Sequence, residues 1–313
     1  MKTGAVFIST GGPKIIRAVR SFKQMEPDLP VHVLMDMTTN TWKANEYNPS
    51  LQNLRDQFGV LTEPLLENDG LVNGAFNAGV RWMKELGYER AACFHDDLIF
   101  PHLHETRYYL TKWFARVQIE PEFRDASGIA FGHFEALVFW PGNIKHQSGN
   151  WHRAPTEWDK LDLESDEVWN KLVKNGVPEH EVDFPDMNFF TLYEGLRGHD
   201  TFRYLTRLGP TGFIIPIDKW EEIGGFDEQY GIFYDIVYPS ECAVRGWNPV
   251  IVAPNSPFLH LHNQTQAFGD PMTNTLFKDT LGSFTTKYGM DIDTFWLKNH
   301  PEWIYEGKRN WFK

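Results

Sequence analysis

Acidic and imidazole side chains suited to metal-ion chemistry follow predicted strands in two parts of the chain. The apolar run at Arg90–Phe94 leads through His95 into Asp96 and Asp97, and His260 and His262 lie two residues apart on a predicted strand. Residues two apart on a strand project to the same face, so either histidine can complete a site with the carboxylates. Carboxylates bind Mg²⁺ and Mn²⁺, and an imidazole ligand favours Mn²⁺. The alternatives are a solvated acidic turn and a structural histidine pair bonded to backbone carbonyls.

Apolar runs alternate with helical periodicity over the first hundred residues, and this order decides where the acidic residues fall. The predicted strands and helices are, in turn, Ala5–Ile8, Lys14–Met25, Val31–Met37, 51–58, Val60–Leu61, Gly74–Leu86 and Arg90–Phe94. The alternation predicts an α/β fold with a mostly parallel, doubly wound sheet flanked by helices. In such sheets ligands bind beyond the carboxyl ends of the strands, where Thr10, Asp36 and Asp96–Asp97 fall.

From about residue 100 to 205 the pattern becomes irregular and rich in His, Trp, Phe and Pro. Within it we predict a strand and two helices, at Gly128–Trp140, Glu105–Val117 and Ser165–Asn175. Regular signals then return as strands and helices at Gly212–Ile217, Asp218–Ile223, Pro239–Arg245 and Pro249–Ala253. We expect one domain over residues 1–277, made of a nucleotide-binding half (1–100), an acceptor-side insertion (101–205) and a completing half (206–277). A helical tail follows at 278–313.

Composition excludes several classes of protein. The 313 residues are 42% hydrophobic and 23% charged, which is ordinary globular composition and not that of a disordered chain. The formal charge of −12 gives no general attraction to nucleic acid. Cys93 and Cys242 are too few for a disulfide framework, and no apolar run is long enough for a transmembrane helix. We therefore expect a soluble, cytoplasmic protein without a transmembrane segment.

Several blocks of sequence, in a fixed order, resemble the GT-A fold glycosyltransferases, and among them the large family-2-like group. These blocks are FIST with the helix IIRAVRSFKQ, then VLMDMTT, ENDGLVNGAFNAGV, CFHDDLIF, and a last block running from IGGFDEQYGIFYD to FLHLHNQT. They cover roughly residues 5–100 and 206–266. The resemblance implies a GT-A, Rossmann-like fold and the transfer of a sugar from a nucleotide-sugar donor to an acceptor hydroxyl.

The resemblance also implies roles for particular residues. Asp97 matches the family's metal-ligand position, and His260 matches a late histidine, with His262 as the other candidate ligand. The residues implied to bind the nucleotide are Thr10, Asp36, Asn77 and Asp96. Asp235 is implied to be the general base of an inverting transfer, and Asp227–Glu228 are expected to order the turn before it. The implied cofactor is Mn²⁺ or Mg²⁺, and the implied donor carries UDP or GDP.

The chain departs from the family pattern in three places. His95 opens the acidic triplet where Asp-x-Asp is usual, and Tyr234 stands before Asp235 where the family has glutamate. The first loop carries Gly11–Pro13 where the family often has a tyrosine, an asparagine and a basic residue. Residues 100–205 align with nothing in the family, and we expect them to select the acceptor. That acceptor is left open between a glycan, a lipid-linked sugar, a protein and modified nucleic acid.

Two other interpretations stay open. His95, Asp97 and His260 have the composition of the two-histidine, one-carboxylate triad of an Fe(II)/2-oxoglutarate-type oxygenase. That class is built on a jelly roll, whereas the N-terminal half of this sequence predicts β-α-β units. The altered triplet and the missing glutamate also allow a catalytically silent, sugar-binding relative of the transferases.

Overall fold

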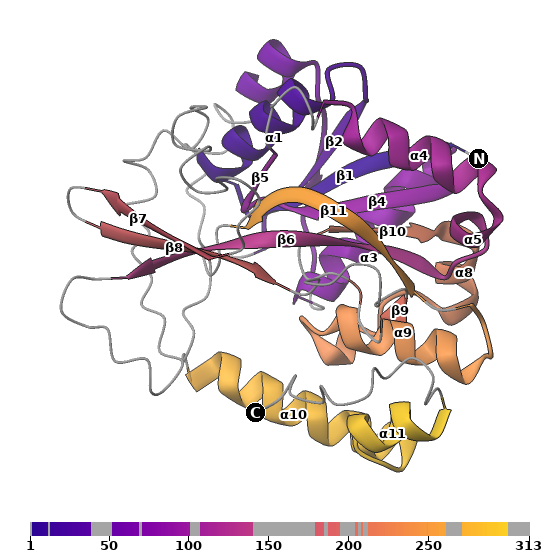
Figure 1. The fold of residues 1–313 in the computed structure, drawn as a ribbon. Helices are drawn as coiled ribbons and strands as arrows, with labels where there is room; N and C mark the ends of the chain where they lie inside the picture. The colour runs from indigo at the N-terminus through magenta and orange to yellow at the C-terminus, as the bar shows by residue number, and fades with distance from the viewer. Residues whose placement is uncertain are drawn as a thin grey trace.

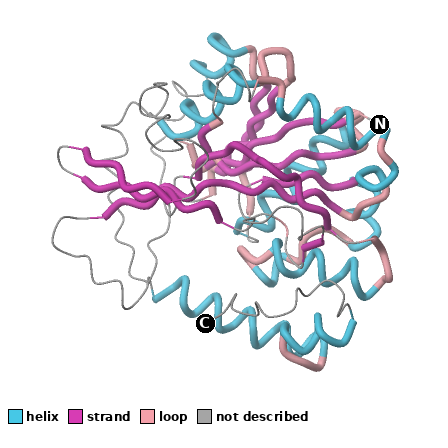
Figure 2. The backbone as a smooth tube through the Cα atoms, in the orientation of Figure 1, coloured by secondary structure: helices cyan, strands magenta, loops and turns pink. Residues whose placement is uncertain are grey.

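The computed structural model describes residues 2–11, 13–38, 52–68, 71–100, 107–139, 179–184, 187–194, 204–205, 208, 212–248, 250–260 and 271–299. Its described strands join in one eleven-stranded mixed sheet. Helices cover both faces of this sheet (Figure 1), and the tube view shows the strands crossing the middle of the molecule (Figure 2). The predicted α/β fold with a mostly parallel, helix-flanked sheet is confirmed.

The N-terminal strands form a parallel block in the order β3-β2-β1-β4. Its elements are β1 (Thr3–Ser9), α1 (Pro13–Met25), β2 (Val31–Asp36), the helical residues 52–58, β3 (Leu61–Leu65), α3 (Leu71–Glu85) and β4 (Arg90–His95). The predicted strand at Val60–Leu61 is longer than expected and contains Pro64. A proline is tolerated there because β3 is the edge strand of the sheet.

The other half of the sheet is mixed. β10 (Gly212–Pro216) lies antiparallel between β4 and β6 (Gly128–Phe139), and β11 (Val250–His260) runs parallel to β6. The short strands β5 (Leu98–Ile99) and β9 (Tyr204–Leu205) pair antiparallel with β11. β8 (Met187–Glu194) pairs antiparallel with β6, and β7 (Glu179–Phe184) pairs antiparallel with β8. The remaining helical elements are α4 (Tyr109–Ile119), α5 (Pro121–Arg124), α8 (Ile217–Ile223), η2 (Glu228–Tyr230), α9 (Tyr234–Val244), α10 (Pro271–Tyr288) and α11 (Ile292–Asn299). The helix predicted at Ser165–Asn175 lies outside the described residues.

Two apolar cores contain many of the aromatic side chains that the structure describes. One core packs α1 and α4 against the sheet and contains four phenylalanines whose ring centroids lie 5.1–6.0 Å apart, Phe7, Phe22, Phe94 and Phe100. The other packs α3, α8 and α9 against the opposite face and contains Phe76, Phe213, Trp220, Phe226 and Tyr234. Such edge-to-face packing adds to the free energy gained by burying the rings. Both faces of the sheet are therefore closed by helices, which leaves its edges for binding.

The surroundings of the two cysteines and the character of the helices bear on two of the expectations from the sequence. Cys93 and Cys242 are both buried, and burial raises the pKa of each thiol, that of Cys242 to about 12. Neither is a reactive thiolate at neutral pH. Among the described residues, no helix combines the length and the apolar character needed to span a membrane.

Helix α9 begins at Tyr234, five residues before the helix predicted at Pro239–Arg245. Proline is usually found in the first turn of a helix, so the sequence suggested a start at Pro239. Here Pro239 lies inside the helix and offers no N–H to the carbonyl of Asp235 four residues earlier. That carbonyl accepts a hydrogen bond of 2.8 Å from the Leu208 N–H instead. The early start places Asp235 in the first helical turn.

The turn between α8 and α9 is held by the side-chain amide of Asn77 on α3. Its Oδ1 accepts hydrogen bonds from Nε1 of Trp220 (3.1 Å) and from the Phe226 N–H (2.7 Å). Its Nδ2 donates to the Phe226 carbonyl and to Oε1 of Glu228, each at 2.8 Å. The four bonds use the whole hydrogen-bonding capacity of the amide. The expected structural role of Asp227–Glu228 in ordering this turn is borne out by these contacts.

Asn73, one helical turn earlier on α3, holds the end of the same turn. Its Oδ1 accepts a hydrogen bond from the Tyr234 N–H (3.1 Å), and its Nδ2 donates to the Asp227 carbonyl (2.8 Å). The Asn73 N–H donates to the Gly231 carbonyl at 2.7 Å. The two asparagines thus fix residues 224–234 and, with them, the first turn of α9.

Glycines 224 and 225 supply a matched test of this arrangement. Both have positive φ, +93° and +92°, so alanine at either is disfavoured by about 1–2 kcal/mol. A Cβ on Gly224 meets nothing within 4 Å, whereas one on Gly225 lies 2.9 Å from Oδ1 of Asn77. We expect Gly225→Ala to lower the free energy of unfolding more than Gly224→Ala, by about 1–3 kcal/mol, because it breaks buried hydrogen bonds. Urea unfolding of both variants measures this difference, and equal losses would contradict it.

Candidate functional site

The end of β1 and the end of β4 are joined by a short chain of hydrogen bonds. The two strands are parallel neighbours, with Ile8 opposite His95. Just beyond them, Oγ of Ser9 donates to Oδ2 of Asp96 at 2.5 Å, and the Gly11 N–H donates to Oγ of Ser9 at 2.7 Å. Asp96 is buried. The predicted residue Thr10, half-buried, lies between the two bonded positions at the same edge.

Asp36 ends β2 at this same edge of the sheet and is also buried. Its Oδ1 accepts hydrogen bonds from the N–H (2.9 Å) and Oγ1 (2.6 Å) of Thr38, and its Oδ2 accepts one of 2.6 Å from Nδ2 of Asn68. The carboxylate therefore fixes both the turn after β2 and the segment that leads into α3. The parallel pairing of β2, β1 and β4 brings Asp36 and Asp96 to one edge, as predicted.

Asp97 lies in the tight turn between β4 and β5, and the sheet brings β11 beside it. In the antiparallel pairing of β5 with β11, His260 stands opposite Leu98, the residue after Asp97. The backbone thus brings the late histidine next to the acidic pair, as a metal site requires. The side chain of His260 and all of His262 lie outside the described part of the chain. Among the described side chains, no group of three or more His, Cys, Asp or Glu is arranged to hold a metal ion.

The residue before Asp235, Tyr234, connects the start of α9 to the end of β4. Oη of Tyr234 and Nε2 of His95 are 3.0 Å apart and hydrogen-bonded, which joins the start of α9 to the end of β4. The Phe76 ring packs edge-on against both rings, with centroids at 5.0 Å from His95 and 4.8 Å from Tyr234. Asp235 itself is buried in the first turn of α9. The hydrogen bond between His95 and Tyr234 therefore connects the candidate base to the acidic triplet, and both residues are positions at which the sequence departs from the family pattern.

The side chain of Asn77, a predicted nucleotide-binding residue, is bonded to the turn after α8 and not to the strand ends. Its amide is fully occupied by the turn at residues 224–228, as described above, and has no hydrogen-bonding position left for a nucleotide. Two residues that we did not predict as site residues contact the acidic side chains at the strand ends. Ser9 anchors Asp96, and Asn68 anchors Asp36. A serine at a strand end and an Asn-x-Gly motif were visible in the sequence, but only the pairing of the strands shows which carboxylate each one contacts.

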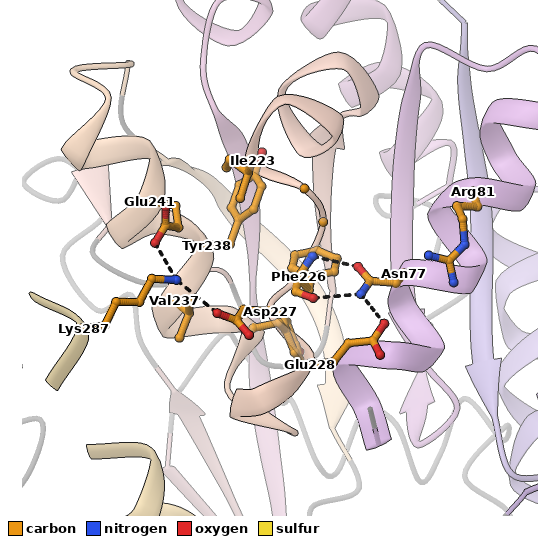
Figure 3. A pocket seen from close by; sticks show the side chains of 13 residues that line it. Asn77, Arg81, Ile223, Phe226, Asp227, Glu228, Val237, Tyr238, Glu241 and Lys287 are labelled. Carbon is orange, nitrogen blue, oxygen red and sulfur yellow. Dashed lines mark hydrogen bonds and ion pairs between the residues drawn. The ribbon is translucent and has the colours of Figure 1, made fainter. Parts of the chain in front are cut away.

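A cavity of about 370 Å³ lies behind the turn at residues 224–228, between α3, α9 and α10 (Figure 3). On one side of it, Nζ of Lys287 from α10 lies 3.0 Å from Oδ2 of Asp227 and 3.0 Å from Oε1 of Glu241. Glu241 also accepts hydrogen bonds from Oη of Tyr288 and from Nη1 of Arg245. Lys287 and Tyr288 thus tie α10 to α9 and to the turn. α10 begins at Pro271, seven residues before the predicted start of the tail.

Comparison with known proteins yields similarity of fold alone. No family model and no curated protein matches the chain. Among solved structures, it is similar to a mannosyltransferase, PcManGT from Pyrobaculum calidifontis, in complex with GDP-Man and Mn²⁺ (TM-score 0.46, 11% identity, 83% of this chain and 56% of that one). It is also similar to GalNAc-T7 with UDP, GalNAc and Mn²⁺ (TM-score 0.48, 11% identity, 83% and 43%). The chain thus spans about half the length of these two proteins.

A third similar structure is a CMP:2-keto-3-deoxy-manno-octonic acid synthetase complexed with CTP (TM-score 0.38, 8% identity, 89% of this chain and 98% of that one). The oxygenase alternative required a jelly roll. The described strands form a mixed α/β sheet with a parallel N-terminal block instead, and Nε2 of His95 is bonded to Tyr234.

The contacts of Glu241 predict how stability depends on pH. Burial raises the pKa of Glu241, but hydrogen bonds from Tyr288, Arg245 and Lys287 outweigh it and leave the pKa below its usual value of 4.5. A carboxyl whose folded pKa is lowered stabilises the protein above its unfolded pKa and loses this contribution as the pH falls through the folded value. We expect Glu241→Gln to lower the free energy of unfolding at pH 7 by about 1.5–3 kcal/mol and to weaken its fall below pH 4.5.

Urea unfolding at pH 7 and at pH 3.5 measures both effects. The matched control is Glu221→Gln, whose carboxylate pairs with Lys84 with 42% of its side chain exposed. A pair so exposed contributes at most about 1 kcal/mol. Equal pH dependence of the wild type and Glu241→Gln would contradict the assignment.

Proposed function

We propose that this protein is a metal-dependent glycosyltransferase that moves a sugar from a nucleotide-sugar donor to an acceptor hydroxyl. The observation that carries the proposal is the alignment of three parallel strand ends, which places Asp36 and Asp96 at one edge, with Asp97 beside the end of β11. Ligands of parallel α/β sheets bind at this edge. A buried acid at the start of α9 is joined to the same edge through Tyr234 and His95.

The donor half of the site consists of Thr10, Asp36 and Asp96 for the nucleotide and Asp97 for the cation. In this proposal Asp36 accepts hydrogen bonds from the base or ribose, and Asp96, anchored by Ser9, faces the ribose or the hydration shell of the cation. The candidate metal ligands fit such a cation, because carboxylate oxygens bind Mg²⁺ and Mn²⁺, and an imidazole ligand from His260 or His262 would favour Mn²⁺. When bound, the cation neutralises charge on the departing diphosphate.

The transfer itself needs one base. Asp235 accepts the proton of the acceptor hydroxyl while the acceptor oxygen forms its bond to the anomeric carbon. The bond from that carbon to the diphosphate oxygen breaks, and the nucleoside diphosphate leaves with the electron pair. Attack opposite to the leaving group inverts the anomeric configuration. A UDP- or GDP-linked donor and an acceptor selected by residues 101–205 complete the proposal.

Metal-dependent nucleotide binding is the first test. UDP or GDP with MnCl₂ should raise the melting temperature, since a hundredfold excess over Kd stabilises the folded protein by about 2.7 kcal/mol. For a chain of this size that is on the order of 5 °C. Asp97→Asn should abolish the shift, measured by differential scanning fluorimetry with each nucleotide.

The matched control is Asp28→Asn, an exposed acid between α1 and the start of β2 at the opposite edge of the sheet. This variant should keep the full shift. A nucleotide shift that is the same in EDTA and in MnCl₂ would sink the metal assignment.

Turnover is the second test, and it uses a panel of UDP- and GDP-sugars with water or an added glycan as acceptor. Asp235→Asn should keep the nucleotide-induced shift in melting temperature and lower the release of nucleoside diphosphate by about 10²–10⁴-fold, the range found for loss of a general base. Unchanged turnover would dismiss Asp235 as the base. Nucleotide binding without turnover by the wild type would favour the silent, sugar-binding relative, and 2-oxoglutarate consumption with Fe(II) would favour the oxygenase.

A further inference from the structure

The hydrogen bond between His95 and Tyr234 joins two residues that each stand directly before a candidate site carboxylate. His95 is the last residue of β4 and precedes Asp96 and Asp97, and Tyr234 is the first residue of α9 and precedes Asp235. We propose that His95 and Tyr234 are positioning residues, whose hydrogen bond sets the place of Asp235 relative to the acidic pair. This inference rests on the proposed transferase function.

The surroundings of the pair hold it in one geometry. Tyr234 is buried, with 3% of its surface exposed, and its N–H is bonded to Oδ1 of Asn73. Its ring is enclosed by Phe76, Phe213 and Phe226 at centroid distances of 4.8, 5.2 and 5.7 Å. A side chain packed on this many sides has little freedom to choose another rotamer. The position of its hydroxyl, and so of the contact with β4, is fixed by the core.

Each of the two elements is also held by its own neighbours. α3 holds the N-terminus of α9 through Asn73, and the sheet holds β4 through its pairing with β1 and β10. The His95–Tyr234 bond joins the two elements directly, at the residues next to their carboxylates. A base has to lie within hydrogen-bond reach of the acceptor while the donor is bound at the acidic pair. Loss of the bond should therefore slow the transfer more than it weakens donor binding.

The test compares Tyr234→Phe, His95→Leu and the double variant with a control on the same helix. Tyr238→Phe is that control, since Oη of Tyr238 donates to the Ser127 carbonyl at 2.9 Å, just before the start of β6. We expect Tyr234→Phe and His95→Leu each to lower kcat about tenfold with KM for the nucleotide sugar changed less than about twofold. The double variant should be no slower than either single one, because all three remove the same bond.

His95→Gln should stay within about twofold of the wild-type kcat, because the glutamine amide can still bond the tyrosine hydroxyl. Tyr238→Phe should leave kcat unchanged even where it lowers the melting temperature as much as Tyr234→Phe. Equal kcat values for Tyr234→Phe and Tyr238→Phe, or losses that multiply in the double variant, would overturn the positioning role.

Hydrogen exchange separates failure of this inference from failure of the proposed function. In Tyr234→Phe, amide exchange should rise several-fold in peptides that contain Asp96–Leu98 and also in peptides that contain Ile236–Val237. Tyr238→Phe should leave exchange at Asp96–Leu98 unchanged. If no nucleotide sugar is turned over by the wild type, the transferase proposal fails while the exchange data still judge the connection. If exchange at Asp96–Leu98 is the same in Tyr234→Phe and the wild type, the pair does not connect the two elements, whatever the activity.

Discussion

Two asparagine amides on one face of α3 hold together parts of the chain that are about 150 residues apart in sequence. Asn73 and Asn77 bond the turn after α8 and the first N–H of α9, and their partners include the N–H groups of three buried residues, Trp220 (Nε1), Phe226 and Tyr234. Leaving such groups unpaired costs about 1–3 kcal/mol each. The position of Asp235, and every role proposed for it, depends on this contact.

The acidic residues at the strand ends are stabilised by hydroxyl and amide groups. Thr38 and Asn68 donate to Asp36, and Ser9 donates to Asp96. These donors are neutral, and their bonds hold each carboxylate in one orientation at the end of its strand.

Aromatic side chains perform two tasks in this fold. Many of those that the structure describes belong to the two cores and close the faces of the sheet. Tyr234 belongs to a core through its ring and contacts the site edge through its hydroxyl. A third group packs α10 and α11 together, where Phe284, Tyr288 and Phe295 have ring centroids 4.4–5.6 Å apart. Through Lys287, this C-terminal pair of helices also supports the turn that carries Asp227.

The sequence by itself determined the α/β class and most of its parallel strands, because their signals are local. Apolar runs bounded by polar turns mark β1, β2 and β4, and helical spacing marks α1 and α3. The same local pattern placed Asp36 and Asp96 at strand ends, and parallel pairing then had to bring them to one edge.

Only the tertiary structure decided which partners these residues have. The start of α9 was misplaced because the cue at Pro239 was local, whereas the group that satisfies the Asp235 carbonyl, Leu208, is distant in sequence. Asn77 carries a side-chain amide of the kind that often binds ligands. Its bond to the turn joins it to Phe226, which is 149 residues away in the sequence. In the sequence, His95 and Tyr234 are two separate departures from a family pattern, and only the structure shows the hydrogen bond of 3.0 Å between them. Hydrogen bonds between distant segments leave no periodic trace in the sequence, so this part of the site required the fold.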